Sequence, residues 1–346
     1  MGNLLAYSGT AAKIRALRSR LLTPEDYRRL ASASSVTDAL ACLRQKPAYR
    51  ELFSGTDAAA LHRGDIEKLL TSAVYQDFQS IYLFSPIGQR KFLDLYFRRY
   101  EIAILKTCLR MVFDHRDVTL NLRIFSEFFG KHSDINLEAL AASRSVQEFT
   151  ENLKGSIYYG TLSRLSPLPS PTLWDYEMSM DLFYFRWFFT AGEKLLKKEE
   201  LAHFREAYGT KIDLLNLLWI CRSRLFFHME PADIYAHLIS VQYRLRTEDL
   251  KALAQAESPE DFLRLIGRTC YGKYFTDCTA SHMQETYRVI RRHVQHRAAT
   301  RDPYSIAPVI SYLYDKEHEV TTITTILECV RYGLPLEKTK KYAKEV

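Results

Sequence analysis

The sequence predicts an all-α protein made of three similar helical units, and three observations lead to this prediction. Gly and Pro are scarce, with 13 and 11 residues among 346, while Leu, Arg, Glu, Lys and Ala abound, which favours long helices over turn-rich sheets. Hydrophobic residues form 47% of the chain, enough for well-filled cores, and we expect the 22 Tyr and 19 Phe mainly there. A helix-opening motif recurs three times.

The motif is Ser-x-x-acid, and each copy opens an apolar helical run. The copies begin at Ser35, Ser145 and Ser258. Their spacing of about 110 residues is far longer than a solenoid repeat and matches the size of a small domain. We expect each Ser hydroxyl to accept the N–H of the third helical residue, while the acid reaches back to the N–H of the capping Ser.

The flanks of the motif also recur. A Leu-Ala pair precedes each Ser, apolar residues follow it at helical spacing, and a Tyr follows those. The three sets are Leu30-Ala31, Leu40, Leu43 and Tyr49; Leu140-Ala141, Phe149, Leu153, Tyr158 and Tyr159; and Leu253-Ala254, Phe262, Ile266 and Tyr271. The pattern predicts a helix ending near Leu-Ala, a short turn and a capped second helix. Chance similarity between ordinary helical hairpins is the alternative explanation.

A second landmark recurs in register with the first. Helices rich in Ile and Leu follow Glu101, Asp213 and Glu319. Two ordered landmarks indicate that a whole unit is repeated, and their spacing predicts units of residues 1–117, 118–228 and 229–346.

The other helices follow from apolar periodicity and capping residues. An amphipathic helix is expected over residues 4–21, and Thr23-Pro24-Glu25-Asp26 caps the next helix, with Thr247-Glu248-Asp249 as its later counterpart. Longer helices are expected over residues 64–84, 88–113, 174–194, 199–227, 280–298 and 304–332. The Pro-rich segment 166–171 is predicted to be a stiff spacer inside the second unit.

Charge and cysteine content set broad limits on function. The net charge of +7 permits binding to acidic surfaces, but Lys and Arg form only short clusters, which are expected to be solvated helix faces. The six Cys show no CxxC spacing, which is typical of reduced thiols in a cytosolic protein. No uncharged apolar stretch is long enough to span a membrane, so a membrane contact is expected to be peripheral or through a partner.

Motifs that would signal catalysis or cofactor binding are absent from the sequence. It contains no GxGxxG, GxxxxGK[ST], GxSxG or DDxxD. His293 and His296 are spaced for one helix face, but Arg291, Arg292 and Arg297 would repel a metal ion there. No catalytic residue, cofactor or metal is therefore expected.

The order of these landmarks resembles the family of C subunits of prokaryotic V-type (A-type) ATPases, which is related to the d subunit of eukaryotic vacuolar ATPases. The likeness covers essentially the whole chain. It rests on Tyr7, Arg15-Ala16-Leu17, Leu21-Leu22, the triplicated unit, the helices that follow the three acids, Lys316-Glu317-His318-Glu319-Val320 and Tyr332-Gly333-Leu334-Pro335.

The resemblance implies a funnel of three helical units with pseudo-threefold symmetry and no catalytic residue. Family members are central-stalk rotor subunits, present as one copy per complex on the cytoplasmic face of the membrane. They receive the axle, subunits D and F, and sit on the ring of proteolipid subunits, transmitting torque for proton or sodium transport. We expect such a chain to be a monomer in isolation and to bind no nucleic acid.

Five residues are candidates for an interface with the axle. They are the recurring Glu101, Asp213 and Glu319, with Arg110 and Arg222 placed nine residues after the first two. The alternative is that the acids are N-terminal helix residues favoured by the helix dipole.

The chain departs from the family pattern acid-x-x-Asn at two of its three copies. Only the copy that begins at Asp213 has the Asn three residues later, as Asn216. Three residues after Glu101 and Glu319 the sequence has Ile104 and Thr322. A shared polar role at this position is therefore not expected.

Three other functional classes fit an all-α basic chain. These are a general helical adaptor or scaffold with a basic surface, a nucleic-acid-binding scaffold and a metal-dependent helical enzyme. Steep salt dependence would mark the second, and bound metal would mark the third.

Overall fold

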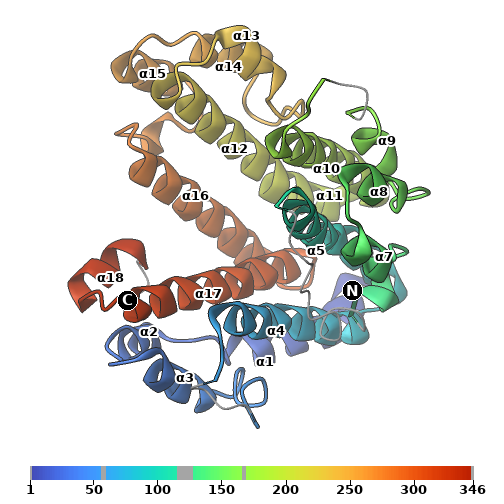
Figure 1. Ribbon diagram of the computed structural model, residues 1–346, viewed down its shortest axis with the longest axis vertical. Helices are drawn as coiled ribbons and strands as arrows, with labels where there is room; N and C mark the ends of the chain where they lie inside the picture. Colours follow the sequence, from blue (N-terminus) through green and yellow to red (C-terminus); the bar gives the residue numbers. More distant parts are fainter. Residues whose placement is uncertain (1, 56–59, 115–127, 166–168, 344–346) are drawn as a thin grey trace. The chain divides into compact units, whose positions relative to one another are not determined.

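The computed structural model describes residues 2–55, 60–114, 128–165 and 169–343. All regular secondary structure in these residues is helical, which confirms the predicted all-α class (Figure 1). The chain divides into two compact units. We call Met1–Pro86 with Asp302–Val346 the terminal unit, because it holds both ends of the chain, and Ile87–Arg301 the middle unit.

The terminal unit is built around one long helix from the C-terminal part of the chain. Its helices are α1 (Gly2–Arg18), α2 (Pro24–Ala31), α3 (Val36–Arg44), α4 (Arg63–Phe84), α17 (Ala307–Arg331) and α18 (Leu336–Tyr342). Helix α17 packs against α1, α2 and α4, so helices from the two ends of the sequence share one core (Figure 1). Leu30, Leu43 and Tyr49 lie in that core together with Ile323 and Ile326.

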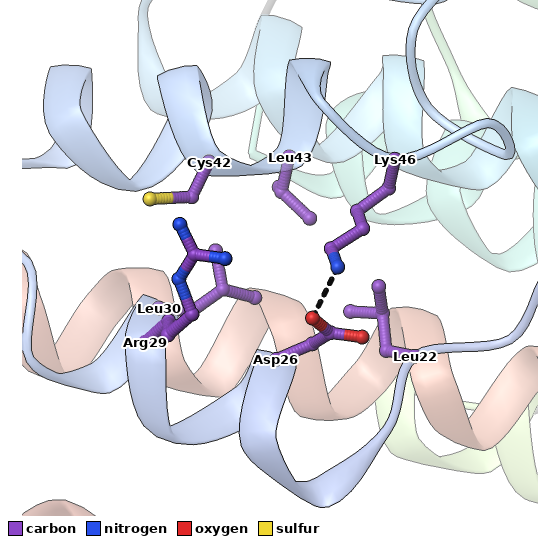
Figure 2. A pocket seen from close by; sticks show the side chains of 7 residues that line it. All are labelled: Leu22, Asp26, Arg29, Leu30, Cys42, Leu43 and Lys46. Carbon is purple, nitrogen blue, oxygen red and sulfur yellow. Dashed lines mark ion pairs between the residues drawn. The ribbon is translucent and has the colours of Figure 1, made fainter.

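The start of α2 shows how the sequence fixes a helix end. Thr23 and Asp26 form a complete capping box, with Pro24 at the first helical position, as the sequence predicted. The Asp26 carboxylate also pairs with Lys46, just beyond α3, over the apolar side chains of Leu30 and Leu43 (Figure 2). Burial raises the pKa of Asp26, but the bonds from Lys46 and Thr23 outweigh it and lower that pKa overall.

The middle unit holds the remaining helices. They are α5 (Ile87–Phe113), α7 (Leu137–Ala142), α8 (Val146–Glu151), α9 (Tyr159–Leu162), α10 (Leu173–Leu195), α11 (Lys198–Phe204), α12 (Thr210–Cys221), α13 (Pro231–Ala236), α14 (Thr247–Ala254), α15 (Pro259–Ile266) and α16 (Ala280–Arg301), with the short turns η1 (Arg205–Gly209), η2 (Arg222–Phe226) and η3 (Gly272–Tyr274). Helix α5 packs along α10, and α12 packs against α14 and α16. Aromatic rings fill the first of these interfaces, where Phe204 contacts Phe92 and Phe188.

The long helices lie within a few residues of their predicted limits. The helix predicted over residues 4–21 ends at Arg18, because the chain turns there toward the cap at Thr23. The helix predicted over residues 199–227 runs through α11, η1, α12 and η2, and both η1 and η2 are π-helical turns. Gly209 in η1 lets the Tyr243 ring approach closely, since a Cβ atom there would lie 2.4 Å from that ring.

All three predicted serine caps are confirmed. Ser35, Ser145 and Ser258 each accept the N–H of the residue three positions later, at 3.1 Å. The second bond expected of a capping box, from the N–H of the capping Ser to the acid, is replaced by others. Glu148 accepts the N–H of Arg144, one residue before the capping Ser145. Asp38 likewise accepts hydroxyl groups, including that of Ser35 at 2.9 Å. The caps are thus one-way hydrogen bonds rather than reciprocal boxes.

The later counterpart of the α2 cap is shifted by one residue. Arg246 is the capping position of α14, its N–H donates to Asp249 at 2.9 Å, and Thr247 is the first helical residue.

Two further sequence predictions concern cysteines and membranes. All six Cys are free thiols, and Cys108, Cys221 and Cys329 are buried inside helices as predicted. Within the described ranges, no helix has the length and apolar character needed to cross a bilayer.

Some predictions about how the chain divides into units are not tested by the structure. The boundary between residues 117 and 118 lies outside the described residues, as do Ser166, Pro167 and Leu168 of the predicted spacer. The division into three units and their funnel-shaped arrangement stay predictions.

Candidate functional site

The three recurring acids lie inside the fold. Their side chains belong to residues that are 0%, 1% and 3% exposed for Glu101, Asp213 and Glu319. Glu101 and Glu319 lie in the middle of α5 and α17, and Asp213 follows α11 and η1 without a break in the helical run. The helix-dipole alternative is therefore wrong for Glu101 and Glu319, because the dipole acts within the terminal turn.

Each buried acid receives the hydroxyl group of a recurring tyrosine. Tyr158 donates to Glu101 at 2.7 Å, Tyr271 donates to Asp213 at 2.8 Å, and Tyr49 donates to Glu319 at 2.5 Å. The two landmarks of the sequence repeat thus meet in space, and we call these contacts the three acid–tyrosine pairs.

The order of pairing differs from the order of the predicted units. Glu101 pairs with Tyr158 of the next Ser-capped segment, and Asp213 pairs with Tyr271 after nearly the same number of residues. Glu319 instead pairs with Tyr49 from the first segment. The last acid of the repeat is therefore paired with the first Ser-capped segment, and this contact lies within the terminal unit.

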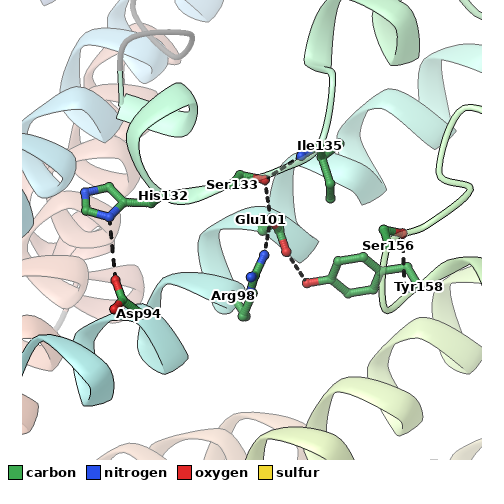
Figure 3. Close-up of polar contacts among 8 residues, drawn as sticks. All are labelled: Asp94, Arg98, Glu101, His132, Ser133, Ile135, Ser156 and Tyr158. Atoms are coloured by element: carbon green, nitrogen blue, oxygen red, sulfur yellow. Dashed lines mark hydrogen bonds and ion pairs between the residues drawn. The ribbon is translucent and has the colours of Figure 1, made fainter.

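The first pair joins three segments of the middle unit (Figure 3). Glu101 accepts Arg98 Nη1 at 2.7 Å and the Ser133 hydroxyl as well as Tyr158. Ser133 Oγ in turn accepts the N–H of Ile135 at 3.1 Å. Burial, followed by the charge of Glu101, holds the pKa of Tyr158 well above its usual value, so the phenol stays a hydrogen-bond donor.

The third pair has the same design with Lys in place of Arg. Glu319 accepts Lys316 Nζ at 2.9 Å and the N–H of Leu22 at 2.5 Å, in addition to Tyr49. The same ammonium group donates to the Tyr49 hydroxyl at 3.1 Å and lies 3.7 Å from Asp77. A network buried in the terminal unit thus ties α4 and α17 to the segment between α1 and α2.

The second pair lacks the cation. Thr210 occupies the position three residues before Asp213, where the other pairs have Arg98 and Lys316. Asp213 accepts the backbone N–H groups of Arg244 at 2.9 Å and Leu245 at 3.3 Å instead. In the described ranges no Lys or Arg forms an ion pair with it, and burial raises its pKa to about 6.

The family amide at Asn216 has a local task. Its side chain donates to the Ile239 carbonyl at 3.1 Å and accepts the Ile239 N–H at 2.9 Å. It therefore holds the segment after α13 against α12. Ile104 and Thr322 are also buried, and the Thr322 hydroxyl contacts His318 Nδ1 on its own helix at 3.4 Å, so the three matching positions have different surroundings.

The two arginines of the predicted interface lie on the surface. Arg110 is exposed and its Nε donates to Glu177 of α10 at 2.5 Å, and Arg222 is exposed at the start of η2. For these two residues a contact with another subunit stays a prediction. The burial of Glu101, Asp213 and Glu319 gives them internal partners and no surface, so a direct axle contact by their carboxylates is not supported.

The chemistry of the three pairs is that of cross-links. Each buried carboxylate accepts several hydrogen bonds from donors inside the fold, which is the arrangement of a structural cross-link. Among the residues that the structure describes, no group of three His, Cys, Asp or Glu could hold a metal ion. Sequence reasoning missed the acid–tyrosine contacts, although the nearly equal separations of Glu101 from Tyr158 and of Asp213 from Tyr271, 57 and 58 residues, were a usable signal.

Comparison with known proteins places nearly the whole chain in one family. The model of the family "ATP synthase (C/AC39) subunit" matches residues 10–342. Relatives named as C subunits of A-type ATP synthases include one from Methanosarcina mazei, 25% identical over 353 residues, covering 96% of this chain and 91% of the relative. One from Methanosarcina barkeri is 26% identical with the same coverage, and one from Thermococcus kodakarensis is 22% identical, covering 98% and 91%.

The predicted resemblance is confirmed, and with it the prediction that the chain is part of a rotary ATPase and is not itself an enzyme. The match with the Methanosarcina mazei relative spans 96% of this chain and 91% of the relative, so it does not concern a shared fragment. The chain belongs to the ATP synthase (C/AC39) subunit family.

Proposed function

We propose that this chain is a central-stalk rotor component of a V-type ATPase or ATP synthase. It acts as a socket between the axle, subunits D and F, and the membrane ring of proteolipid subunits. In that place it transmits torque for proton or sodium transport. The observation that carries the proposal is the set of three acid–tyrosine pairs, one for each copy of the repeat, in a chain of this family.

A part that transmits torque must resist shear between its own helices. Each acid–tyrosine pair cross-links segments that lie far apart in the sequence, through a buried hydrogen bond between the Tyr hydroxyl and the carboxylate and further bonds around it. Buried, fully satisfied polar networks rigidify a fold, because breaking one bond leaves a desolvated charge. Long helices joined in this way supply stiffness without any catalytic group.

The three copies also bear on the geometry of the proposal. Three similar units arranged with pseudo-threefold symmetry as a funnel would enclose a cavity that one axle tip could enter. Many modest contacts around that cavity could hold an axle of different symmetry. Under this proposal the chain is a monomer in isolation and one copy attaches peripherally to the cytoplasmic face of the membrane.

Binding to the two partners tests the proposal. The full chain is purified and titrated against a D–F complex and against the detergent-solubilised proteolipid ring, with bovine serum albumin as a negative control. We expect saturable binding to each partner, one copy per complex by native mass, and restored ATP-driven ion transport when the chain is added to a complex that lacks it. A monomer that binds neither partner would contradict the proposal and favour a general helical adaptor.

A further inference from the structure

A pocket in the middle unit lies between α9, α10 and the segment after α13. The pocket and the open solvent at its mouth together comprise about 830 Å³ of empty space. Arg164 and Arg186 contribute its charged groups, and Leu182, Phe183 and Leu238 contribute apolar walls. The described lining contains no acidic side chain.

The two arginines differ from other basic residues on these helices. Arg110 pairs with Glu177, and Arg205 pairs with Glu193. In contrast, Arg164 and Arg186 are exposed, and within the described part of the chain neither guanidinium forms an ion pair or hydrogen bond. Two unpaired cations that line one pocket repel each other and attract an anion.

The shape and composition of the pocket favour a protein-borne carboxylate over a free anion. The pocket is open to solvent, so the charges alone would bind a small free anion weakly at physiological salt. Guanidinium groups bind carboxylates in a planar, two-point geometry. The apolar walls would contact aliphatic side chains that flank such a carboxylate on a helix.

One wall of the pocket is long enough for a helix to lie along it. The lining residues of α10 run from Ser179 to Arg186, two helical turns or about 10 Å at 1.5 Å per residue. At the start of α10, Trp174 is 48% exposed and packs on His237, with ring centroids 4.8 Å apart. His237 lies between the lining residues Ala236 and Leu238, so this Trp packs on the segment that forms one side of the pocket, and Trp is a residue type enriched among binding anchors.

We propose that this pocket, with Arg164 and Arg186, binds an acidic amphipathic helix of another protein of the complex. The partner helix would carry two carboxylates about one turn apart with aliphatic residues between them. The inference rests on the proposed function in that the partner belongs to the same rotor.

A labelled peptide provides the direct test. The probe is a 20-residue helical peptide that carries two Glu four residues apart among Leu and Ala, and a Gln peptide is its control. Fluorescence anisotropy with the full chain should show saturable binding of the Glu peptide that weakens at least tenfold in the R164E/R186E variant. Arg268→Glu, at another exposed arginine of the middle unit, should leave the dissociation constant unchanged.

Several outcomes would overturn the proposal. These are no saturable binding to the wild-type chain, equal binding of the Gln peptide, or equal binding by R164E/R186E. Displacement of the peptide by an equal concentration of inorganic phosphate, or a loss in the variant only of binding to vesicles of anionic lipid, would assign the pocket to another ligand. The R164Q/R186Q variant, checked by thermal unfolding, keeps the test valid if charge reversal disturbs folding.

Assembly assays separate this inference from the proposed function. If the wild-type chain binds neither the D–F complex nor the ring, the proposed function fails. The peptide-binding result then decides by itself whether the pocket inference holds. If wild type and R164E/R186E assemble equally well and the peptide does not bind, the pocket inference fails and the proposed function stands.

Discussion

Each buried carboxylate of the repeat is stabilised by a different set of donors. Glu101 and Glu319 each have a cation three residues earlier on the same helix, whereas Asp213 depends on Tyr271 and two backbone N–H groups. A buried charge without a counter-ion favours its neutral form, because desolvation is only partly offset by hydrogen bonds. The second pair should therefore be the one that responds to pH near neutrality.

The Asp213→Asn variant tests this response. The folded pKa of Asp213 is raised from 3.8 to about 6, so its stabilising contribution is complete below pH 4 and is lost as the pH rises through 6. Relative to the variant, wild type should lose on the order of 2–3 kcal/mol of unfolding free energy between pH 4 and pH 7. Urea unfolding at both pH values measures the difference, and parallel pH dependence in the two proteins would contradict it.

Replacing Lys316 tests the opposite case, in which the buried carboxylate of Glu319 has a cation as its counter-ion. Replacing it by Met leaves Glu319 buried without a cation, which should cost about 3–5 kcal/mol of unfolding free energy. The double variant Lys316→Met with Glu319→Gln removes both charges and should recover part of that loss. A double-mutant cycle measures the coupling, and strictly additive costs would show that the two groups do not act as a pair.

At the scale of helices, one close contact fixes how α10 packs on α11. Gly192 of α10 faces the ring of Phe204, and a Cβ atom there would lie 2.1 Å from that ring. Phe204 is fully buried among other rings, including Phe188 and Tyr208, so it cannot move aside cheaply. The absence of a side chain at residue 192 is thus a packing requirement.

Gly192→Ala should therefore destabilise the protein by about 1–3 kcal/mol or more, as overpacking does in a filled core. Gly160→Ala in α9 is the matched control, because a Cβ atom there meets nothing within 4 Å. That control should be neutral or slightly stabilising, since Ala is the better helix former. Similar thermal midpoints for the two variants would argue against the contact with Phe204.

The helices themselves were largely predictable from sequence, and their partners were not. Local signals such as the Ser35 cap and Pro24 mark helix ends, because capping depends on neighbouring residues only. The contact of Tyr49 with Glu319 depends on how distant segments pack, and no local rule encodes it. The two π-helical turns around α12 also escaped prediction, since an inserted residue does not alter the apolar pattern enough to be read.

At the scale of the whole chain, the three acid–tyrosine pairs divide unequally between the two compact units. The pairs of Glu101 and Asp213 lie in the middle unit, and the pair of Glu319 lies in the terminal unit, where it joins both ends of the chain. Composition and spacing predicted that the repeat has three copies. They did not predict that the first Ser-capped segment would pair with the last acid, because that pairing needs the chain ends to meet.

If the pairs hold their own units together, removing one should loosen only the unit that contains it. Glu319→Gln in the full chain should raise amide hydrogen exchange in α2 and α17 by roughly tenfold, because a weakened network opens locally at lower cost. Exchange in α5 and α8 should stay at the wild-type rate, and Glu101→Gln should give the reverse pattern. Exchange that rises equally in both units for either variant would mean that the chain opens as one cooperative body, and the pairs would then be stabilising the molecule as a whole.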